Sequence, residues 1–133
     1  MQRIDREDLA LFCEESALRL ERIGRALERL AACQPLDIEL VHTLFRETHS
    51  LKGAANLLHL RPVEQLSHTL EEILDGIRGG SLAPDQPLLD LLSAGYARIG
   101  QLLQSPQVLP LIDVSREVAA IERHLAARRP ALR

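Results

Sequence analysis

The chain has few of the residues that build sheets, disulfides or membrane spans. Its 133 residues include no tryptophan, one tyrosine and two phenylalanines. The core must therefore be built from leucine, alanine, isoleucine and valine, which suits packed helices better than strands. No apolar run approaches the roughly 20 residues of a membrane-spanning helix, and the N-terminus lacks a signal-peptide core. We therefore expect a cytoplasmic location and no membrane insertion.

Cysteines, charges and loops argue against other classes of protein. Cys13 and Cys33 share no motif with other metal ligands, which favours two reduced cytosolic residues over a disulfide or a metal site. The net charge of −3 makes nucleic acid or an anionic membrane an unfavourable partner. There is no G-x-x-x-x-G-K-[ST] loop and no glycine-rich phosphate cradle. We therefore expect this chain to bind no nucleotide, cofactor or metal by itself.

Apolar periodicity predicts an all-α protein of one domain. Leucine, isoleucine and valine recur at three- and four-residue steps, and proline or glycine separates the periodic segments. Short connections favour an up-down-up-down four-helix bundle with an additional fifth C-terminal helix. We assign residues 1–127 to the domain and 128–133 to a tail or the start of a linker. The predicted helices span residues 5–32, 37–58, 62–78 and 85–104, a loop covers 105–110, and Asp113 or Ser115 caps the last helix, which ends near 127.

Charged side chains of the first predicted helix lie outside its apolar stripe. They include Arg19, Arg22 and Arg25. This pattern is typical of a solvated helix face.

Chemistry concentrates on the second predicted helix, around His49. A stripe of apolar residues is expected to be buried there, and His49 lies at its edge. Lys52 and Gly53 are three and four residues further on, so they share the face of His49. Glycine inside a helix costs roughly 1 kcal/mol relative to alanine, but it lets a large partner reach the ring. The lysine places a cation where an added anion would sit. The stripe consists of Leu44, Phe45, Thr48, Leu51, Ala55 and Leu58.

The third predicted helix carries a matching polar stripe that includes His68 and Glu71. The short connection makes the two helices antiparallel neighbours. With residue 60 as the midpoint, His49 and Glu71 are each eleven residues away and lie at the same height. By the same count Lys52 is level with His68. The sequence therefore predicts a cluster of two histidines, a carboxylate and an ammonium group.

The strings HSLKG at 49–53 and LSHTLE at 66–71 resemble the histidine phosphotransfer (HPt) domain. The resemblance is greatest to the N-terminal phosphotransfer domain of CheA-type chemotaxis histidine kinases, and it spans roughly residues 9–103. It implies that His49 is phosphorylated, that Glu71 holds its ring, and that Lys52 and His68 complete the polar cluster. The chain departs from the family pattern where glycine is usual, at Asn56 and His59, which bears on the turn after the site.

The expected chemistry follows from the two imidazole nitrogens. If Glu71 accepts a hydrogen bond from Nδ1–H of His49, the tautomer is fixed and Nε2 keeps the lone pair that attacks phosphorus. Lys52 would offset phosphate charge. His68 would hydrogen-bond either Glu71 or the ring. His42, His59 and His124 lack such neighbours, and we interpret them as surface or boundary residues.

The resemblance implies a phosphorelay carrier and not an enzyme in its own right. Phosphate would come from ATP and Mg²⁺ bound by a separate domain of a histidine kinase, the expected parent protein. It would leave to an aspartate of a response-regulator receiver docked over Gly53 and the apolar residues that flank the histidine. Two alternatives stay open: a stand-alone phosphotransfer protein, and a vestigial docking bundle that takes no phosphate. A di-metal bundle needs two Glu-x-x-His pairs. It is disfavoured because Glu39 and His42 form one such pair and a second is missing.

Overall fold

The five predicted helices are present in the computed structural model, which describes residues 5–32 and 36–128. Their ends agree with the prediction to within one residue. The predicted loop at 105–110 is partly wrong, because its last two residues belong to a short 3-10 helix, and Leu109 there is fully buried. Cys33 and residues 129–133 of the predicted tail lie outside the described residues. The helices are α1 (Arg6–Ala32), α2 (Ile38–Leu57), α3 (Arg61–Arg78), α4 (Gln86–Leu103) and α5 (Ser115–Arg128), with η1 (Leu109–Leu111) before α5.

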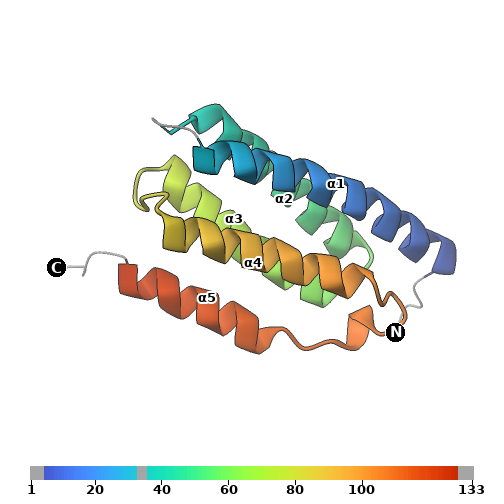
Figure 1. Cartoon of the computed structure of the whole chain (residues 1–133). Coiled ribbons are helices and arrows are strands. Elements are labelled where there is room, and N and C mark those ends of the chain that lie inside the picture. The colour runs from blue at the N-terminus through green and yellow to red at the C-terminus, as the bar shows by residue number, and fades with distance from the viewer. Residues whose placement is uncertain (1–4, 33–35, 129–133) are drawn as a thin grey trace.

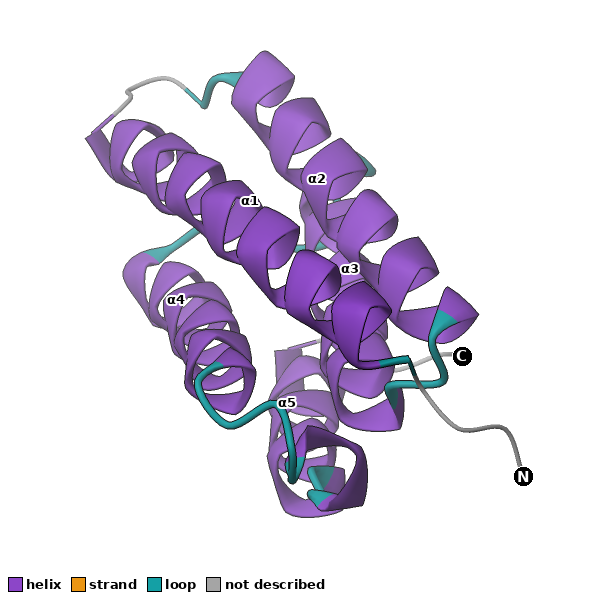
Figure 2. Cartoon of the chain, turned by 90° about the vertical axis from the view of Figure 1, so that its right-hand side faces the viewer, coloured by secondary structure: helices purple, strands orange, loops and turns teal. Residues whose placement is uncertain are grey.

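The helices form an up-down-up-down bundle, as predicted. Each of α1 to α3 packs against the next helix in the chain, and α4 packs back against α1, which closes the bundle. The fifth helix packs on the outside, against α3 (Figure 1). In Figure 2, turned by 90°, α5 lies at the bottom of the view, outside the group formed by the other helices. The fold is all-α over the part of the chain that the structure describes.

Aspartates define where the helices begin. The Asp37 carboxylate accepts a hydrogen bond from the backbone N–H of Glu39, and that of Asp85 accepts one from Leu88. Each satisfies a donor that the first helical turn leaves unpaired. Proline occurs in the first turn of α3 and of α4, where it removes no helical hydrogen bond.

The turn from α2 to α3 requires a left-handed residue. The N–H of Leu60 bonds the carbonyl of Ala55, and that of His59 bonds Asn56, which is the Schellman pattern of a helix end. His59 therefore has a φ of 59°. Gly80 fills the corresponding position after α3 with a φ of 83°. His59 is exposed, as predicted, but its backbone takes a conformation that is strained for a residue other than glycine.

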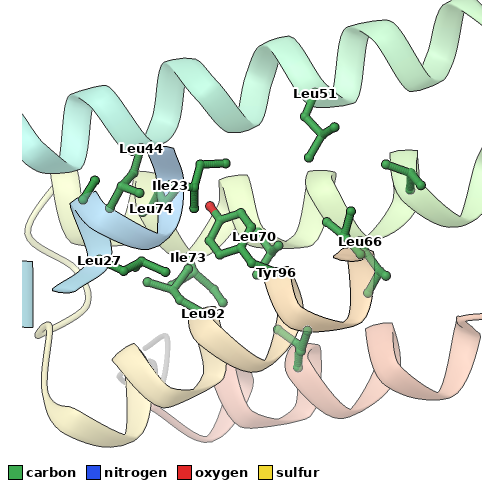
Figure 3. Close-up of a cluster of buried hydrophobic side chains, with 14 of the residues drawn as sticks. Ile23, Leu27, Leu44, Leu51, Leu66, Leu70, Ile73, Leu74, Leu92 and Tyr96 are labelled. Atoms are coloured by element: carbon green, nitrogen blue, oxygen red, sulfur yellow. The ribbon is translucent and has the colours of Figure 1, made fainter. Parts of the chain in front are cut away.

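Apolar side chains of all five helices, most of them leucines, form the core, and Figure 3 shows a cluster of them. Side chains of α3 lie at the centre: Leu66, Leu70 and Leu74 are fully buried. One close approach depends on glycine, since a Cβ at Gly95 of α4 would lie 2.5 Å from Leu70 Cδ2. This packing fixes α3 against α2 and α4, and so fixes the height of the polar residues that α3 carries.

Candidate functional site: an exposed histidine held by a buried carboxylate

His49 and Glu71 meet across α2 and α3. Nδ1 of His49 lies 2.8 Å from Oε2 of Glu71. An ionised carboxylate can only accept hydrogen bonds, so Nδ1 carries the proton. The His49 side chain is 64% exposed and that of Glu71 only 10%. The predicted equal height of the two residues is therefore correct, and a mostly buried carboxylate contacts a mostly exposed imidazole.

The second oxygen of Glu71 binds Lys52. The Lys52 ammonium lies 2.8 Å from Oε1 and donates to it. A buried carboxylate without such donors would be costly, and here both of its oxygens are used. Lys52 thus lies on the same carboxylate as His49, one helical turn further along α2. Its contribution to binding phosphate stays a prediction.

His68 does not make the contact that the sequence predicts. Its Nε2 lies 3.5 Å from Oε1 of Glu72, one turn along the same helix. The expected hydrogen bond to Glu71 or to the His49 ring is absent: His49 and Lys52 bind the two oxygens of Glu71, and His68 faces Glu72 instead. Together with Lys52, Glu64 and Gln65, His68 lines a hollow of about 310 Å³ beside the site. Its participation in the chemistry stays a prediction.

Phe45 is only half-buried, whereas its position in the apolar stripe predicts burial. Its ring stacks on that of His49, with centroids 6.2 Å apart and planes 8° from parallel. The Arg78 guanidinium lies 3.9 Å from the centroid of the Phe45 ring and is held by Asp75 at 2.6 Å. The apolar pattern does not reveal the stacking, although the four-residue spacing from Phe45 to His49 could have indicated it.

A buried hydrogen bond anchors α2 beneath the site. The Thr48 hydroxyl donates to the carbonyl of Leu44 at 2.7 Å. The single hydroxyl proton of Thr48 is thereby used, so the hydroxyl of Tyr96, on α4, donates a hydrogen bond to Thr48. Burial raises the pKa of Tyr96 well above its ordinary value. The residue next to His49 is thus tied to another helix by a group that stays neutral.

The arginines of α1 lie closer to the site than the sequence predicts. Arg19 and Arg22 both pair with Glu47 of α2, at 2.6 and 2.8 Å. Arg22 is exposed, as the prediction of a solvated face requires, whereas Arg19 is half-buried, and both contact the helix that carries His49. The hydrogen bond from Arg22, together with the charges of both arginines, holds the pKa of Glu47 below its ordinary value.

Gly53 lies on open surface one turn after His49. A Cβ built on it would meet no atom within 4 Å, so no helix packs there. This openness agrees with room for a partner, although the residue's function stays a prediction. Within residues 5–32 and 36–128, no three metal-ligating side chains group together, and no helix is long and apolar enough to cross a membrane.

Fold and site together define a helical bundle that presents an imidazole, His49, protonated at Nδ1 and open at its other edge. The family model of the Hpt domain matches residues 8–104. The chain therefore belongs to the Hpt domain family, and it is a phosphotransfer module of two-component signalling.

Curated relatives agree with this assignment. The chain is 30% identical to the chemotaxis protein CheA of Bacillus subtilis over 117 residues, which are 88% of this chain and 17% of the relative. It is 34% identical to CheA of Cereibacter sphaeroides over 106 residues, 77% of this chain and 15% of the relative. No solved structure matches the chain significantly. The chain thus spans about a sixth of the length of these relatives.

Proposed function

We propose that His49 is the phosphoacceptor of a phosphorelay carrier. The contact between Nδ1 of His49 and Glu71 at 2.8 Å carries this proposal. It leaves the lone pair on Nε2, and the 64% exposed ring can be reached by a donor. When the N–P bond forms, the proton stays on Nδ1 and the ring becomes cationic. Glu71, which faces Nδ1, stabilises that charge.

The phosphoryl group comes from ATP and Mg²⁺ bound by a separate kinase domain in the cytoplasm. The γ-phosphate bond to ADP breaks as the bond to Nε2 forms. The group then passes to an aspartate of a response-regulator receiver. The names of the relatives support a chemotaxis kinase as the parent protein, since one further relative, of Helicobacter pylori, is named sensor histidine kinase CheAY (29% identical over 58 residues, 44% of this chain and 7% of the relative).

The test is phosphorylation of this chain by a CheA-type kinase core that lacks its own phosphotransfer domain. Wild type, His49→Gln and the matched control His68→Gln are incubated with labelled ATP. We expect label on wild type and on His68→Gln, none on His49→Gln, and loss of the label in acid, as for a phosphoramidate.

Each other result contradicts a part of the proposal. Label that persists on His49→Gln and disappears from His68→Gln would make His68 the acceptor. No label on any folded variant, with the cognate core, would support a docking bundle that takes no phosphate. Acid-stable label would exclude phosphohistidine altogether.

A further inference from the structure

The plane of the His49 ring requires a contact besides Glu71. The lone pair of Nε2 lies in the plane of the imidazole, so the tilt of the ring sets the direction of attack on phosphorus. A single hydrogen bond at Nδ1 fixes the tautomer and one point of the ring, but it does not fix the tilt. A side chain that is 64% exposed would otherwise reorient on a picosecond to nanosecond timescale.

We propose that Phe45 is a positioning residue that holds the plane of the His49 imidazole for attack by Nε2. This inference rests on the proposed function of His49. The two rings are only 8° from parallel, and their separation of 6.2 Å falls within the range of offset stacks. Phe45 is one turn before His49 on α2, so the helix itself brings the two side chains together.

Arg78 restrains the Phe45 ring in turn. Its guanidinium lies 3.9 Å from the Phe45 centroid, a cation–π geometry. Asp75 holds that guanidinium at 2.6 Å from the same helix, α3. Asp75 thus holds Arg78, Arg78 packs on Phe45, and Phe45 packs on the ring of His49. These contacts act on the face of the ring, whereas Glu71 acts at Nδ1.

Removing the aromatic face of Phe45 should slow phosphorylation of His49 without changing the tautomer of its imidazole. Phe45→Leu keeps apolar bulk but removes the flat face, and we expect phosphorylation of His49 to slow about 3- to 10-fold, in keeping with the strength of aromatic pairs. Phe45→Tyr keeps the face and should retain the wild-type rate. Phe12→Leu on α1 changes the only other phenylalanine and should leave the rate unchanged.

The experiment uses phosphoramidate as a small donor, so that docking of a kinase cannot influence the rate. Nε2 forms a bond to phosphorus, the P–N bond of phosphoramidate breaks, and ammonia leaves. In parallel, ¹⁵N NMR reports the tautomer of His49, and ring relaxation reports its motion. For Phe45→Leu we expect protonated Nδ1 as in wild type, faster ring motion and slower phosphorylation.

The outcomes separate this inference from the proposed function. If wild type takes label and His49→Gln does not, the proposed function holds; an unchanged rate and unchanged ring motion in Phe45→Leu would then overturn the inference alone. Slowing with a kinase core but not with phosphoramidate would also overturn it, because Phe45 would be a docking contact. A lost Nδ1 tautomer in folded Phe45→Leu would assign the effect to Glu71 instead.

Discussion

Glu71 divides its carboxylate between two residues of α2: one oxygen lies 2.8 Å from Nδ1 of His49, and the other lies 2.8 Å from the Lys52 ammonium. The spacing of three residues between His49 and Lys52 lets one carboxylate reach both. The charge that would develop on the ring during phosphorylation therefore faces an anion that is already fixed in position. Because the carboxylate needs no reorganisation, this arrangement favours attack by the exposed imidazole.

Replacing Glu71 should slow phosphorylation of His49. Glu71→Gln keeps the shape but removes the charge that faces the ring, and Glu71→Ala removes the hydrogen bond as well. A charge-assisted hydrogen bond contributes about 1.5–3 kcal/mol, so we expect at least a roughly tenfold slower rate for Glu71→Ala. The rate is measured with phosphoramidate at pH 7. Glu72→Gln, which alters the neighbouring carboxylate, is the control; equal rates in all variants would exclude an orienting function for Glu71.

Two substitutions at Gly53 should test different properties: alanine tests the stability of α2, and tryptophan tests the docking of a receiver. In Gly53→Ala the new methyl meets no atom within 4 Å, so the free energy of unfolding should rise by about 0.5–1 kcal/mol through helix propensity. Gly53→Trp should stay folded and react normally with phosphoramidate, but it should slow transfer to a receiver about tenfold or more. Urea unfolding and stopped-flow transfer check the two effects. Wild-type transfer by the tryptophan variant would contradict a partner footprint over Gly53.

The turn after α2 should be improved by glycine. His59 has a φ of 59°, which glycine adopts without the steric cost of a side chain. We expect His59→Gly to raise the free energy of unfolding by about 0.5–1 kcal/mol, measured by urea unfolding at pH 7. The reverse substitution, Gly80→Ala at a φ of 83°, is the control, and it should lower the free energy of unfolding by about 1 kcal/mol. A less stable His59→Gly would mean that the turn does not depend on this backbone strain.

Acid should weaken the contact between α1 and α2. Arg22 and Arg19 lower the pKa of Glu47 in the folded state, so at acidic pH the unfolded state binds more protons at this group. The ion pair therefore contributes fully to the free energy of unfolding above the ordinary glutamate pKa of about 4.3. This contribution is lost as pH falls through the lower pKa that Glu47 has in the folded state. Urea midpoints of wild type and Glu47→Gln should differ at pH 6 and converge by pH 3. When Arg22→Met is present in both proteins, most of the difference in urea midpoint that Glu47→Gln causes at pH 6 should vanish. If wild type and Glu47→Gln instead differ in midpoint by the same amount at every pH, this ion pair does not contribute to stability.

The sequence predicted the architecture well because local signals carried it. Aspartates at 37 and 85, prolines in first turns and glycines at 79 and 80 set the helix ends, and each is a local effect. Counting from the turn also placed His49 level with Glu71, since two antiparallel helices of equal rise keep their register. The family strings around 49–53 and 66–71 lie on those same helices, so the motif and the geometry agree.

The partners of individual side chains were less predictable. The charge pattern predicts a solvated Arg19, which instead binds Glu47. The sequence predicts that His68 bonds Glu71 or the His49 ring, whereas it lies against Glu72. Both errors concern long or rotatable side chains at the edge of a helix face. A period of 3.6 residues gives the face but not the rotamer, and it cannot say which of two nearby carboxylates is already occupied.

The sequence by itself determined the five helices, the order in which they pack, and the placement of a histidine opposite a glutamate. These follow from apolar spacing, caps and loop lengths, which act between residues close in the chain. Only the tertiary structure decided that Glu71 is shared by His49 and Lys52, that Phe45 stacks on the His49 ring beneath Arg78, and that His59 takes a left-handed conformation. Those features depend on how far each helix is rotated about its axis and on competition among neighbouring side chains, which are settled only when the helices pack.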